Sequence, residues 1–481
     1  MPGVNRVPWR LLLPADRQSP VLRLGEENPA LDEALEGSRV ETSESAGPFA
    51  AVVRLPGGPR PADLERLQKT LLPQGYLLWI SGYGERDGLT GVPAHRLRAG
   101  GRAVWSAEGS WARPLRGTGK VDLMLRLLRP GQPRPRYELA LVPPGRGGGW
   151  IFELIEELSR RGVIESTPAG LGRIDRTETG AAIGQMAARD GTRLALKVAL
   201  EERLASEMIH ERSCLARLQN RTSLSDAMRG TLPAVLAADR FHGTYYRLER
   251  WFPGRPALEL MYRRRERERI VDRAIEWITT LHRQTPGPPR DPAPCAEWAR
   301  TTLAGVASRS TDGDREFPGR VGDYLGERLQ RLALPTVHGH GDYWLGNVIH
   351  DPRSGAVTGV IDWNHADELA PPLEDVLHLL FHRKWLFSIY DPGARVAALV
   401  ERKTDRRDRE RIARYLGALG LDPQLLGPLT VLYWVRYLAS REATLSSRRG
   451  WYERSYRKVR EVLATRLGPD LDALGPWIAS S

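Results

Sequence analysis

The sequence feature that most constrains the fold is a hairpin pattern whose ends carry polar side chains. Two apolar runs, Val348–His350 and Val357–Ile361, flank a stretch of turn-forming residues at 351–355. Runs of this length and composition on either side of a turn predict a β-hairpin. Because a hairpin brings its two open ends together, Asn347 and Asp362 are expected to lie side by side.

The polar residues at that end have the chemistry of phosphoryl transfer. Asp342 precedes Asn347 in the string His-Gly-Asp-Tyr-Trp-Leu-Gly-Asn, and Asp362 is followed by Trp363. The reaction needs a carboxylate that orients a hydroxyl and accepts its proton, and oxygen ligands that hold Mg²⁺ on the phosphates. We assign Asp342 to catalysis, Asn347 to catalysis and metal binding, and Asp362 to metal binding. Taken singly, Asn347 could instead cap a turn and Asp362 could end a strand.

This segment resembles the aminoglycoside phosphotransferase and choline kinase-like family. The family's catalytic loop looks like His-Gly-Asp with an Asn further on, and its metal-binding strand looks like Ile-Asp-Trp. Protein kinases have Arg before the catalytic Asp and Phe-Gly after the metal Asp, whereas this chain has Gly341 and Trp363. The resemblance covers residues 160–481. It implies an α+β protein-kinase-like fold of two lobes, one small and β-rich and one large and helical, that uses ATP and Mg²⁺.

The resemblance also implies a lysine for the phosphates of ATP and an acidic residue on a helix that pairs with it. Lys197 lies in the apolar run Leu194–Leu200, which predicts a strand. The helical pattern of residues 201–218 offers Glu211 as the partner, with Glu207 one turn earlier as the alternative. Each of these residues also has an explanation that requires no function. Lys197 could be an exposed lysine of a strand, and Glu211 and Glu207 could lie on a solvated helix face.

Four further positions are expected to contact the nucleotide. Gly180 and Gly184 lie in the pattern Thr179–Gly184, which matches a phosphate-binding loop only loosely because Gly-x-Gly-x-x-Gly is absent. Glu249 and Trp251 lie in a β-rich run that ends in Pro-Gly. This run resembles the strand and hinge that link the lobes in the family, where adenine would bond to the main chain.

Residues 1–149 are not needed by the kinase-like region and alternate between strand and helix patterns. Strands are predicted at Val21–Leu24, Phe49–Leu55, Tyr76–Tyr83, near Val104 and at Tyr137–Val142, and helices at Pro29–Leu35, Pro61–Leu72 and Val92–Leu97. This alternation predicts an α/β Rossmann-like domain. The string Leu67–Leu78 looks like part of a class I methyltransferase, but only Gly25 remains of the glycine-rich turn after the first strand. We therefore expect a degenerate domain without a working cofactor site.

The predicted organisation has three parts. Residues 1–149 form the Rossmann-like domain, residues 150–255 the small lobe with a bridging helix, and residues 256–481 the helical lobe with the catalytic and metal-binding loops. The glycine-rich stretch 143–149 marks the first junction. Helices of the third part are predicted at Ile270–His282, Pro372–Arg383, Asp405–Leu419, Leu425–Glu442 and Trp451–Leu467. Asp375 is expected to support the catalytic loop through hydrogen bonds.

The expected activity is ATP- and Mg²⁺-dependent transfer of the γ-phosphate to a hydroxyl of an aminoglycoside-, sugar- or amino-alcohol-like molecule. Only residues 364–370 separate the metal strand from Pro371, too few for the peptide-binding segment of a protein kinase. Acidic residues could attract an amine and tryptophans could pack against a sugar, namely Asp367, Glu368 and Glu374, and Trp344, Trp363 or Trp385. The explanations that require no function are favoured for them, because acidic loop residues are usually solvated and tryptophans usually fill the core. The alternative is a pseudokinase or interaction protein that docks a partner through its N-terminal domain.

The composition limits which partners the protein is expected to bind and where in the cell it is expected to be. The net charge is +12, but 59 Asp and Glu are interspersed among 71 Lys and Arg, so no nucleic-acid surface is predicted. Two cysteines are too few for a disulfide scaffold. No run reaches the roughly 18 apolar residues of a membrane span, and Leu11–Leu13 is too short for a signal peptide. We expect a cytoplasmic protein that binds neither nucleic acid nor membrane, with no indication of its oligomeric state.

Overall fold

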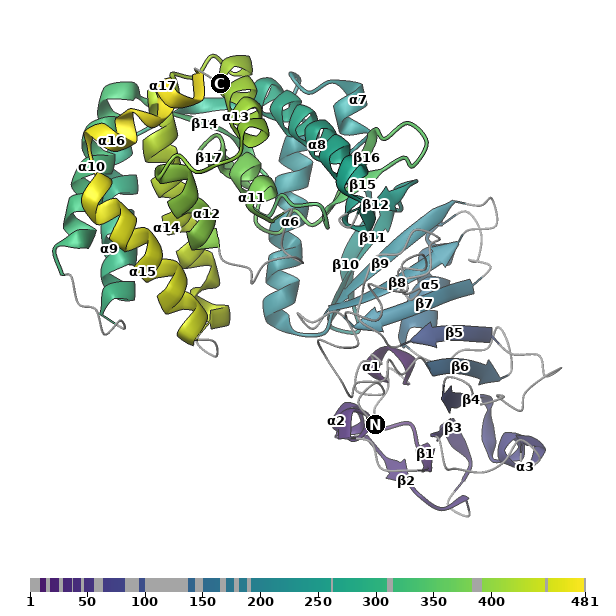
Figure 1. The fold of residues 1–481 in the computed structure, drawn as a ribbon. Coiled ribbons are helices and arrows are strands. Elements are labelled where there is room, and N and C mark those ends of the chain that lie inside the picture. Colours follow the sequence, from purple (N-terminus) through teal and green to yellow (C-terminus); the bar gives the residue numbers. More distant parts are fainter. Residues whose placement is uncertain are drawn as a thin grey trace. The chain divides into compact units, whose positions relative to one another are not determined.

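The computed structural model describes residues 9–13, 18–25, 29–36, 38–44, 47–55, 64–82, 95–99, 137–142, 150–164, 170–176, 181–187, 192–260, 263–308, 315–382, 392–445 and 449–479. The chain divides into two compact units (Figure 1). Unit 1 comprises Met1–Ile209 and Pro233–Phe252, and unit 2 comprises His210–Leu232 and Pro253–Ser481. Helix α6 (Glu202–Gln219) begins in unit 1 and ends in unit 2.

Unit 1 is built on one sheet of eleven described strands in the order β10-β11-β9-β8-β7-β5-β6-β4-β3-β1-β2. The strands are β1 Val21–Leu24, β2 Val40–Glu41, β3 Phe49–Arg54, β4 Leu71–Gly82, β5 His95–Ala99, β6 Tyr137–Val142, β7 Gly170–Arg176, β8 Ala181–Ala187, β9 Arg193–Ala199, β10 Val235–Phe241 and β11 Thr244–Arg250. The strands from β1 to β4 pair in parallel. The strands from β7 to β11 pair antiparallel, and β5 joins β7 in parallel.

The N-terminal strands largely follow the sequence pattern. Strands occur at four of the predicted places, and α2 (Pro29–Leu35) matches the first predicted helix. The helix predicted at Val92–Leu97 is wrong, because residues 95–99 form β5 and pair antiparallel with β6. Charged and apolar residues alternate there from Arg96 onward, which is the two-residue period of a strand. The regions near Val104 and at 143–149 lie outside the described residues, and the Rossmann-like assignment stays a prediction.

The helices of unit 1 bury apolar side chains against this sheet. They are α1 Trp9–Leu12, α2, α3 Leu64–Lys69 and α5 Trp150–Arg160. Helix α5 buries Ile151, Leu154, Ile155 and Leu158, which have the three- and four-residue spacing of one helix face. These residues share a hydrophobic cluster with Leu196 and other side chains of the sheet. The predicted bridging helix thus supplies the core under the strand that carries Lys197.

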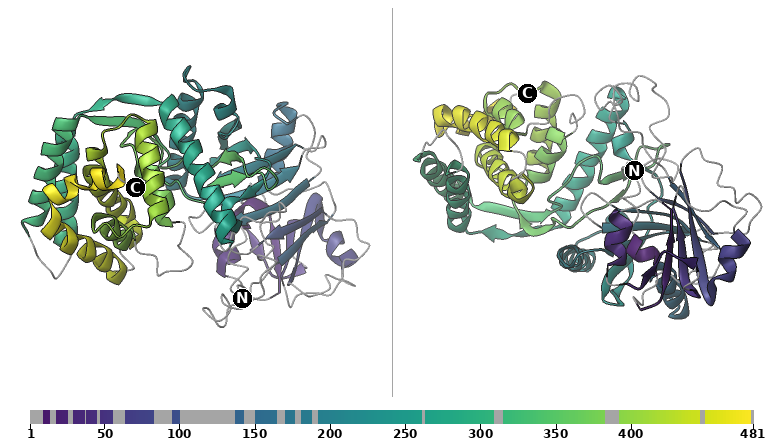
Figure 2. Two further views of the ribbon diagram at one scale, coloured as in Figure 1. Left: turned by 45° about the horizontal axis from the view of Figure 1, so that its top comes forward. Right: turned by 90° about the horizontal axis from the view of Figure 1, so that it is seen from below.

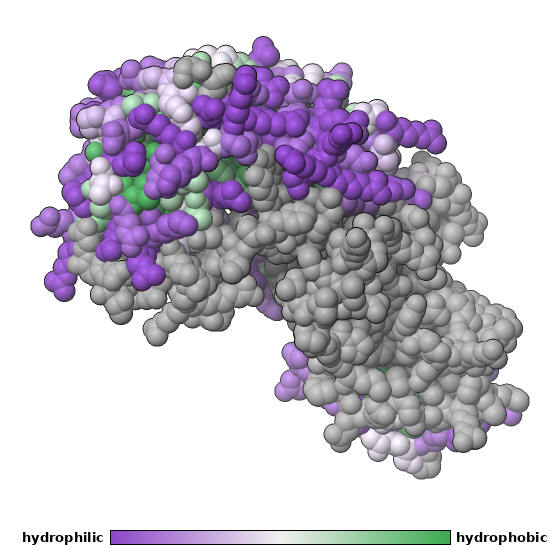
Figure 3. All heavy atoms as spheres, viewed as in Figure 1, coloured by the Kyte–Doolittle hydropathy of each residue, from purple (hydrophilic) through white to green (hydrophobic). Residues whose placement is uncertain are grey.

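Unit 2 is mainly helical, as predicted (Figures 1 and 2). Its helices are α7 Asp226–Arg229, α8 Arg264–Gln284, α9 Pro292–Ala307, α10 Phe317–Leu332, α11 Glu374–His382, α12 Pro392–Val400, α13 Arg406–Ala418, α14 Leu426–Leu445, α15 Arg449–Arg466, α16 Pro469–Asp472 and α17 Leu474–Ala479, with 3₁₀ turns at Ala257–Leu260 and Pro423–Leu425. One large hydrophobic cluster holds them together, with Trp434 of α14 and Phe317 of α10 fully buried in it. In Figure 3 the described part of the face of unit 2 turned toward the viewer is largely hydrophilic.

Two small sheets in unit 2 position the candidate site. Strand β12 (Arg255–Pro256) pairs with β15 (Val348–His350), which pairs with β16 (Val357–Val360). Strand β13 (Pro286–Arg290) pairs with β14 (Leu334–Gly339), which pairs with β17 (Asp367–Ala370). The segment between β14 and β15 is the predicted catalytic loop. Within the described part of the chain, every helix is too short or too polar to cross a bilayer.

Candidate functional site

The catalytic loop follows β14 and requires a glycine next to its aspartate. Gly341 has a φ of 80°, and a Cβ atom there would lie 2.1 Å from the carbonyl oxygen of His365. Only glycine fits both this backbone conformation and this space. The position before Asp342 therefore cannot hold the arginine that protein kinases have there.

Asp375, in the first turn of α11, holds this loop in place. Its carboxylate accepts hydrogen bonds from the backbone N–H groups of His340 at 2.8 Å and Gly341 at 2.9 Å. His282 Nε2 lies 3.3 Å from the same carboxylate. Burial alone would raise the pKa of Asp375, but its bond to His282 and its other partners lower that pKa to about 2. The predicted supporting bonds of Asp375 are thus confirmed.

Asp342 and Asn347 are joined directly. The side-chain amide of Asn347 donates to the backbone carbonyl oxygen of Asp342 at 2.9 Å and to its Oδ2 at 3.1 Å. Both bonds use the N–H groups of the amide, so its carbonyl oxygen is available as a ligand. The side chain of Asn347, the predicted cation ligand, therefore also holds the carboxylate of Asp342, the predicted catalytic residue.

The predicted hairpin is present and brings Asp362 beside this pair. Val348 of β15 lies opposite Val360 of β16, and the N–H of Ile361 donates to the carbonyl oxygen of Asn347 at 2.9 Å. Asp362 follows at once, is exposed, and has a φ of 70°. Asp adopts this left-handed conformation more readily than most residues. Asn347 and Asp362 thus lie at the same open end of the hairpin.

These two side chains suit Mg²⁺. A hard cation prefers carboxylate and amide oxygens, and Mg²⁺ commonly completes its shell with water and substrate phosphates. Among the described residues, no group of three or more His, Cys, Asp and Glu could hold a metal. If Asn347 and Asp362 hold a cation, water and phosphate oxygens are the ligands that commonly complete the shell of Mg²⁺.

Asp342 has a histidine partner that sequence reasoning missed. His378 Nε2, on α11, lies 3.1 Å from Asp342 Oδ1, and His378 Nδ1 lies 3.4 Å from the hydroxyl of Tyr433. The ring of His382 stacks on that of His378 with 3.7 Å between centroids. Burial would raise the pKa of Asp342, but the bond to His378 and nearby histidines lower it far below its usual range. Asp342 is therefore ionised and held in one orientation.

Glu211 is buried in unit 2 and contacts the segment that follows β16. Its carboxylate accepts a hydrogen bond from the backbone N–H of Trp363 at 3.1 Å. Trp363 is fully buried and packs on His340, with 4.6 Å between ring centroids. Glu211 therefore fixes the backbone that follows Asp362. The alternative residue, Glu207, is partly exposed and pairs with Arg203.

In unit 1, Lys197 contacts a residue that the sequence placed at the hinge. Lys197 Nζ lies 3.4 Å from Glu249 Oε2, and Glu249 Oε1 lies 2.5 Å from Arg247 Nε. Arg247 is fully buried and lies directly opposite Lys197 in the pairing of β9 with β11. Lys197, Arg247 and Glu249 thus form a charged cluster on the sheet, in which Arg247 and Glu249 are buried and Lys197 is partly buried. The predicted pairing of Lys197 with Glu211 stays a proposal.

The other predicted nucleotide residues are placed as follows. Gly184 lies inside strand β8 and pairs with Leu196, so its assignment to a loop is wrong. Gly180, predicted to lie in the same loop, is outside the described residues. Trp251 follows β11, and its backbone N–H donates to the carbonyl oxygen of Arg193 at 2.9 Å. That N–H is already engaged within the sheet, and the role of Trp251 at adenine stays a prediction.

The acidic residues expected to attract an amine are paired with arginines. Arg436 lies 3.3 Å from Asp367 and 2.9 Å from Glu374, and Arg217 forms an ion pair with Glu368. Their negative charge is thus offset by neighbouring guanidinium groups. These ion pairs do not favour the attraction of an amine by the three acidic residues, which stays a prediction.

Of the three tryptophans that could pack against a sugar, Trp363 fills the core instead, as the favoured alternative predicted, because its side chain is fully buried. Trp344 is partly exposed, and Trp385 lies outside the described residues. His378 could have been found from the sequence, since it follows Asp375 by three residues and so shares its helix face. The ion pairs of Arg436 could not be predicted from the neighbouring sequence, because they join elements that are far apart in the chain.

Several solved structures are similar to this chain. The aminoglycoside phosphotransferase APH(3'')-Id from Streptomyces rimosus is 21% identical, with 58% of this chain and 95% of that chain covered and a TM-score of 0.35. The macrolide 2'-phosphotransferase MphH from Brachybacterium faecium is 15% identical, with 66% and 98% covered and a TM-score of 0.39. An aminoglycoside phosphotransferase from Alicyclobacillus acidocaldarius is 16% identical, with 62% and 89% covered and a TM-score of 0.36.

A family model decides the assignment. Residues 185–461 match the model of the phosphotransferase enzyme family. This match spans more than half of the 481 residues, so the chain belongs to that family. No curated protein matches the chain. The predicted family and the prediction of a phosphotransferase are confirmed.

Proposed function

We propose that this member of the phosphotransferase enzyme family transfers the γ-phosphate of ATP to a hydroxyl group of a small molecule, with Mg²⁺ as its metal. The observation that supports this proposal most is the direct contact of Asn347 with Asp342, at the end of the hairpin that bears Asp362. A proton acceptor and two oxygen ligands at one loop are what phosphoryl transfer requires. Family membership supports the same reaction class.

In the proposed step the acceptor hydroxyl oxygen attacks the γ-phosphorus of ATP. The new O–P bond forms while the bond from the γ-phosphorus to the bridging oxygen breaks, and ADP leaves with that electron pair. Asp342 orients the hydroxyl and takes its proton, which is consistent with an ionised carboxylate held by His378. Mg²⁺, held by Asn347 and Asp362, would neutralise charge on the phosphates.

The cluster on β9 and β11 supports a nucleotide role for unit 1. Lys197 would contact ATP phosphates, as its strand position and its resemblance to the family lysine suggest. Glu249 contacts the lysine at 3.4 Å and limits its freedom, which lowers the entropy cost of binding a phosphate. Gly180, Gly184 and Trp251 remain proposed nucleotide contacts.

The segment after Asp362 favours a small acceptor over a protein. Residues 367–370 form β17, which pairs with β14. The chain after the metal strand is therefore part of a sheet, and Pro371 follows directly. We also propose a cytoplasmic location, because the protein would use ATP and its two cysteines are free and buried.

The test is a screen of the full chain for ATP-dependent phosphorylation of hydroxyl compounds and of mixed peptides. Asp342→Asn serves as the control, and its turnover should fall about a hundredfold or more while nucleotide affinity is retained. A parallel loss of ATP affinity in Asp342→Asn would mean that Asp342 is structural. Efficient labelling of peptides with no small molecule labelled would contradict the proposed acceptor class.

A further inference from the structure

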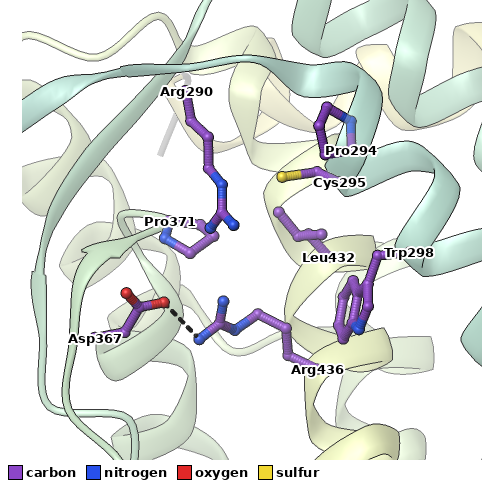
Figure 4. Close-up of a pocket in the computed structure, with 8 residues that line it drawn as sticks. All are labelled: Arg290, Pro294, Cys295, Trp298, Asp367, Pro371, Leu432 and Arg436. Carbon is purple, nitrogen blue, oxygen red and sulfur yellow. Dashed lines mark hydrogen bonds and ion pairs between the residues drawn. The ribbon is translucent and has the colours of Figure 1, made fainter.

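A pocket of about 340 Å³ lies in unit 2 among β13, β17, α9 and α14 (Figure 4). Its apolar lining includes Trp298, Pro371 and Leu432. Trp298 is 37% exposed, which is unusual for so large an apolar side chain in a folded protein. A volume of this size suits a ring-sized part of a small molecule.

The polar lining of this pocket is dominated by arginine. Arg290 and Arg436 point into the same space in Figure 4, with Asp367 bound to Arg436. Arg436 is held by Asp367 and by Glu374. The backbone of Arg290 pairs with Leu334 in the sheet, but its exposed side chain has no hydrogen-bond or ion-pair partner among the described residues. The pocket therefore offers a guanidinium group that no described residue pairs with, beside an apolar wall.

The pocket adjoins the catalytic loop through two elements. Asp367 lies opposite Gly339, the residue just before the loop, in the pairing of β14 with β17. On α11, Glu374 contacts Arg436 of the pocket, and His378 contacts Asp342. Glu374 and His378 are four residues apart on this helix, about 6 Å along its axis. An acceptor that occupies the pocket would thus be close to the catalytic carboxylate.

We propose that this pocket binds an anionic oxygen group of the acceptor, so that the acceptor is a hydroxylated acid with an apolar body and not a polyamine. This inference rests on the proposed function, because only a phosphotransferase would have an acceptor to bind in this pocket. A guanidinium group binds carboxylate and phosphate through paired, charge-assisted hydrogen bonds. A cationic acceptor would meet Arg290 and Arg436, while the acidic residues that could attract it are paired.

The test uses three probes with one scaffold and different charge: 3-hydroxybenzoate, 3-hydroxybenzyl alcohol and 3-hydroxybenzylamine. Their affinities for the full chain are measured by calorimetry, without turnover. The benzoate should bind about tenfold or more tightly than the amine, and Arg290→Gln should remove that advantage while barely changing binding of the alcohol. Phenyl phosphate as a fourth probe separates a carboxylate site from a phosphate site.

The control is Arg331→Gln, which removes the same charge from an exposed arginine of α10 whose side chain bonds Gln424. It should leave all affinities unchanged. Equal or tighter binding of the amine, unchanged benzoate binding in Arg290→Gln, or no binding of any probe at millimolar concentration would overturn the inference. Failure of the proposed phosphotransfer is a separate result, because it appears as absent turnover while these affinities persist.

Discussion

Replacement of Asp375 by Asn should destabilise unit 2 and loosen the catalytic loop together. The carboxylate of Asp375 accepts from two backbone N–H groups and lies beside His282, with its side chain buried. An amide has only one accepting oxygen, so Asp375→Asn turns an NH₂ group toward one of these donors. A buried donor without an acceptor costs about 1–3 kcal/mol.

The pKa of Asp375 gives a second measure of the same effect. The pKa falls from 3.8 to about 2 in the folded chain, and each unit corresponds to about 1.4 kcal/mol. Ionisation of Asp375 therefore contributes about 2 kcal/mol to folding at neutral pH. Since the folded pKa is depressed, this contribution is fully present above about pH 4 and is lost as the pH falls through about 2.

The assay is denaturant unfolding of the full chain and of Asp375→Asn at several pH values, with amide hydrogen exchange at His340 and Gly341. The variant should lose about 2–4 kcal/mol at neutral pH, and the difference should narrow toward pH 2. Asp470→Asn is the control, because Asp470 is exposed and such a change costs about 0.5 kcal/mol or less. A pH-independent difference, or unchanged exchange at the two amides, would refute the reasoning.

Further outcomes are expected at the site and in the N-terminal region. Asn347→Ala and Asp362→Ala should lose Mg²⁺-dependent nucleotide binding, measured by calorimetry with and without chelator, and equal binding of ATP by the parent chain in chelator would contradict the metal assignment. His378→Leu should lower kcat by up to about a hundredfold with little change in KM, with partial rescue in His378→Gln; equal rates in both variants would exclude an orienting bond. Gly341→Ala should cost about 2 kcal/mol or more in unfolding free energy, and a stable, active variant would show that the loop can adopt another conformation. Residues 1–149 within the full chain should not bind S-adenosylmethionine, and micromolar binding would overturn that view.

The catalytic hairpin could be predicted from sequence because its information is local. The turn residues at 351–355 and the apolar runs on either side determine which ends meet, so Asn347 and Asp362 had to be neighbours. The need for Gly341 was visible only as a difference from protein kinases. Its physical reason, the carbonyl oxygen of His365, comes from a residue beyond the hairpin.

Contacts between segments far apart in the chain could not be predicted from the sequence, unlike the hairpin. Arg436 neutralises Asp367 and Glu374 from a helix that begins more than fifty residues later. The sequence shows only that acidic residues follow Asp362, and their ion pairs with arginine become visible in the structure. Likewise Glu249 fits a hinge by position, and only the pairing of β9 with β11 places it beside Lys197.

The continuity of the sheet in unit 1 determines whether a shortened chain would self-associate. Strand β7 has β8 on one side and β5 on the other, so its backbone groups face a neighbour in both directions. A chain shortened to begin at Trp150 would lack β5 and expose one row of N–H and C=O groups, which favours pairing with other copies. Residues 1–149 thus cover the edge of β7 whether or not they bind a ligand. Self-association of the shortened chain would therefore result from exposure of this strand edge, and would be no evidence that residues 1–149 regulate activity.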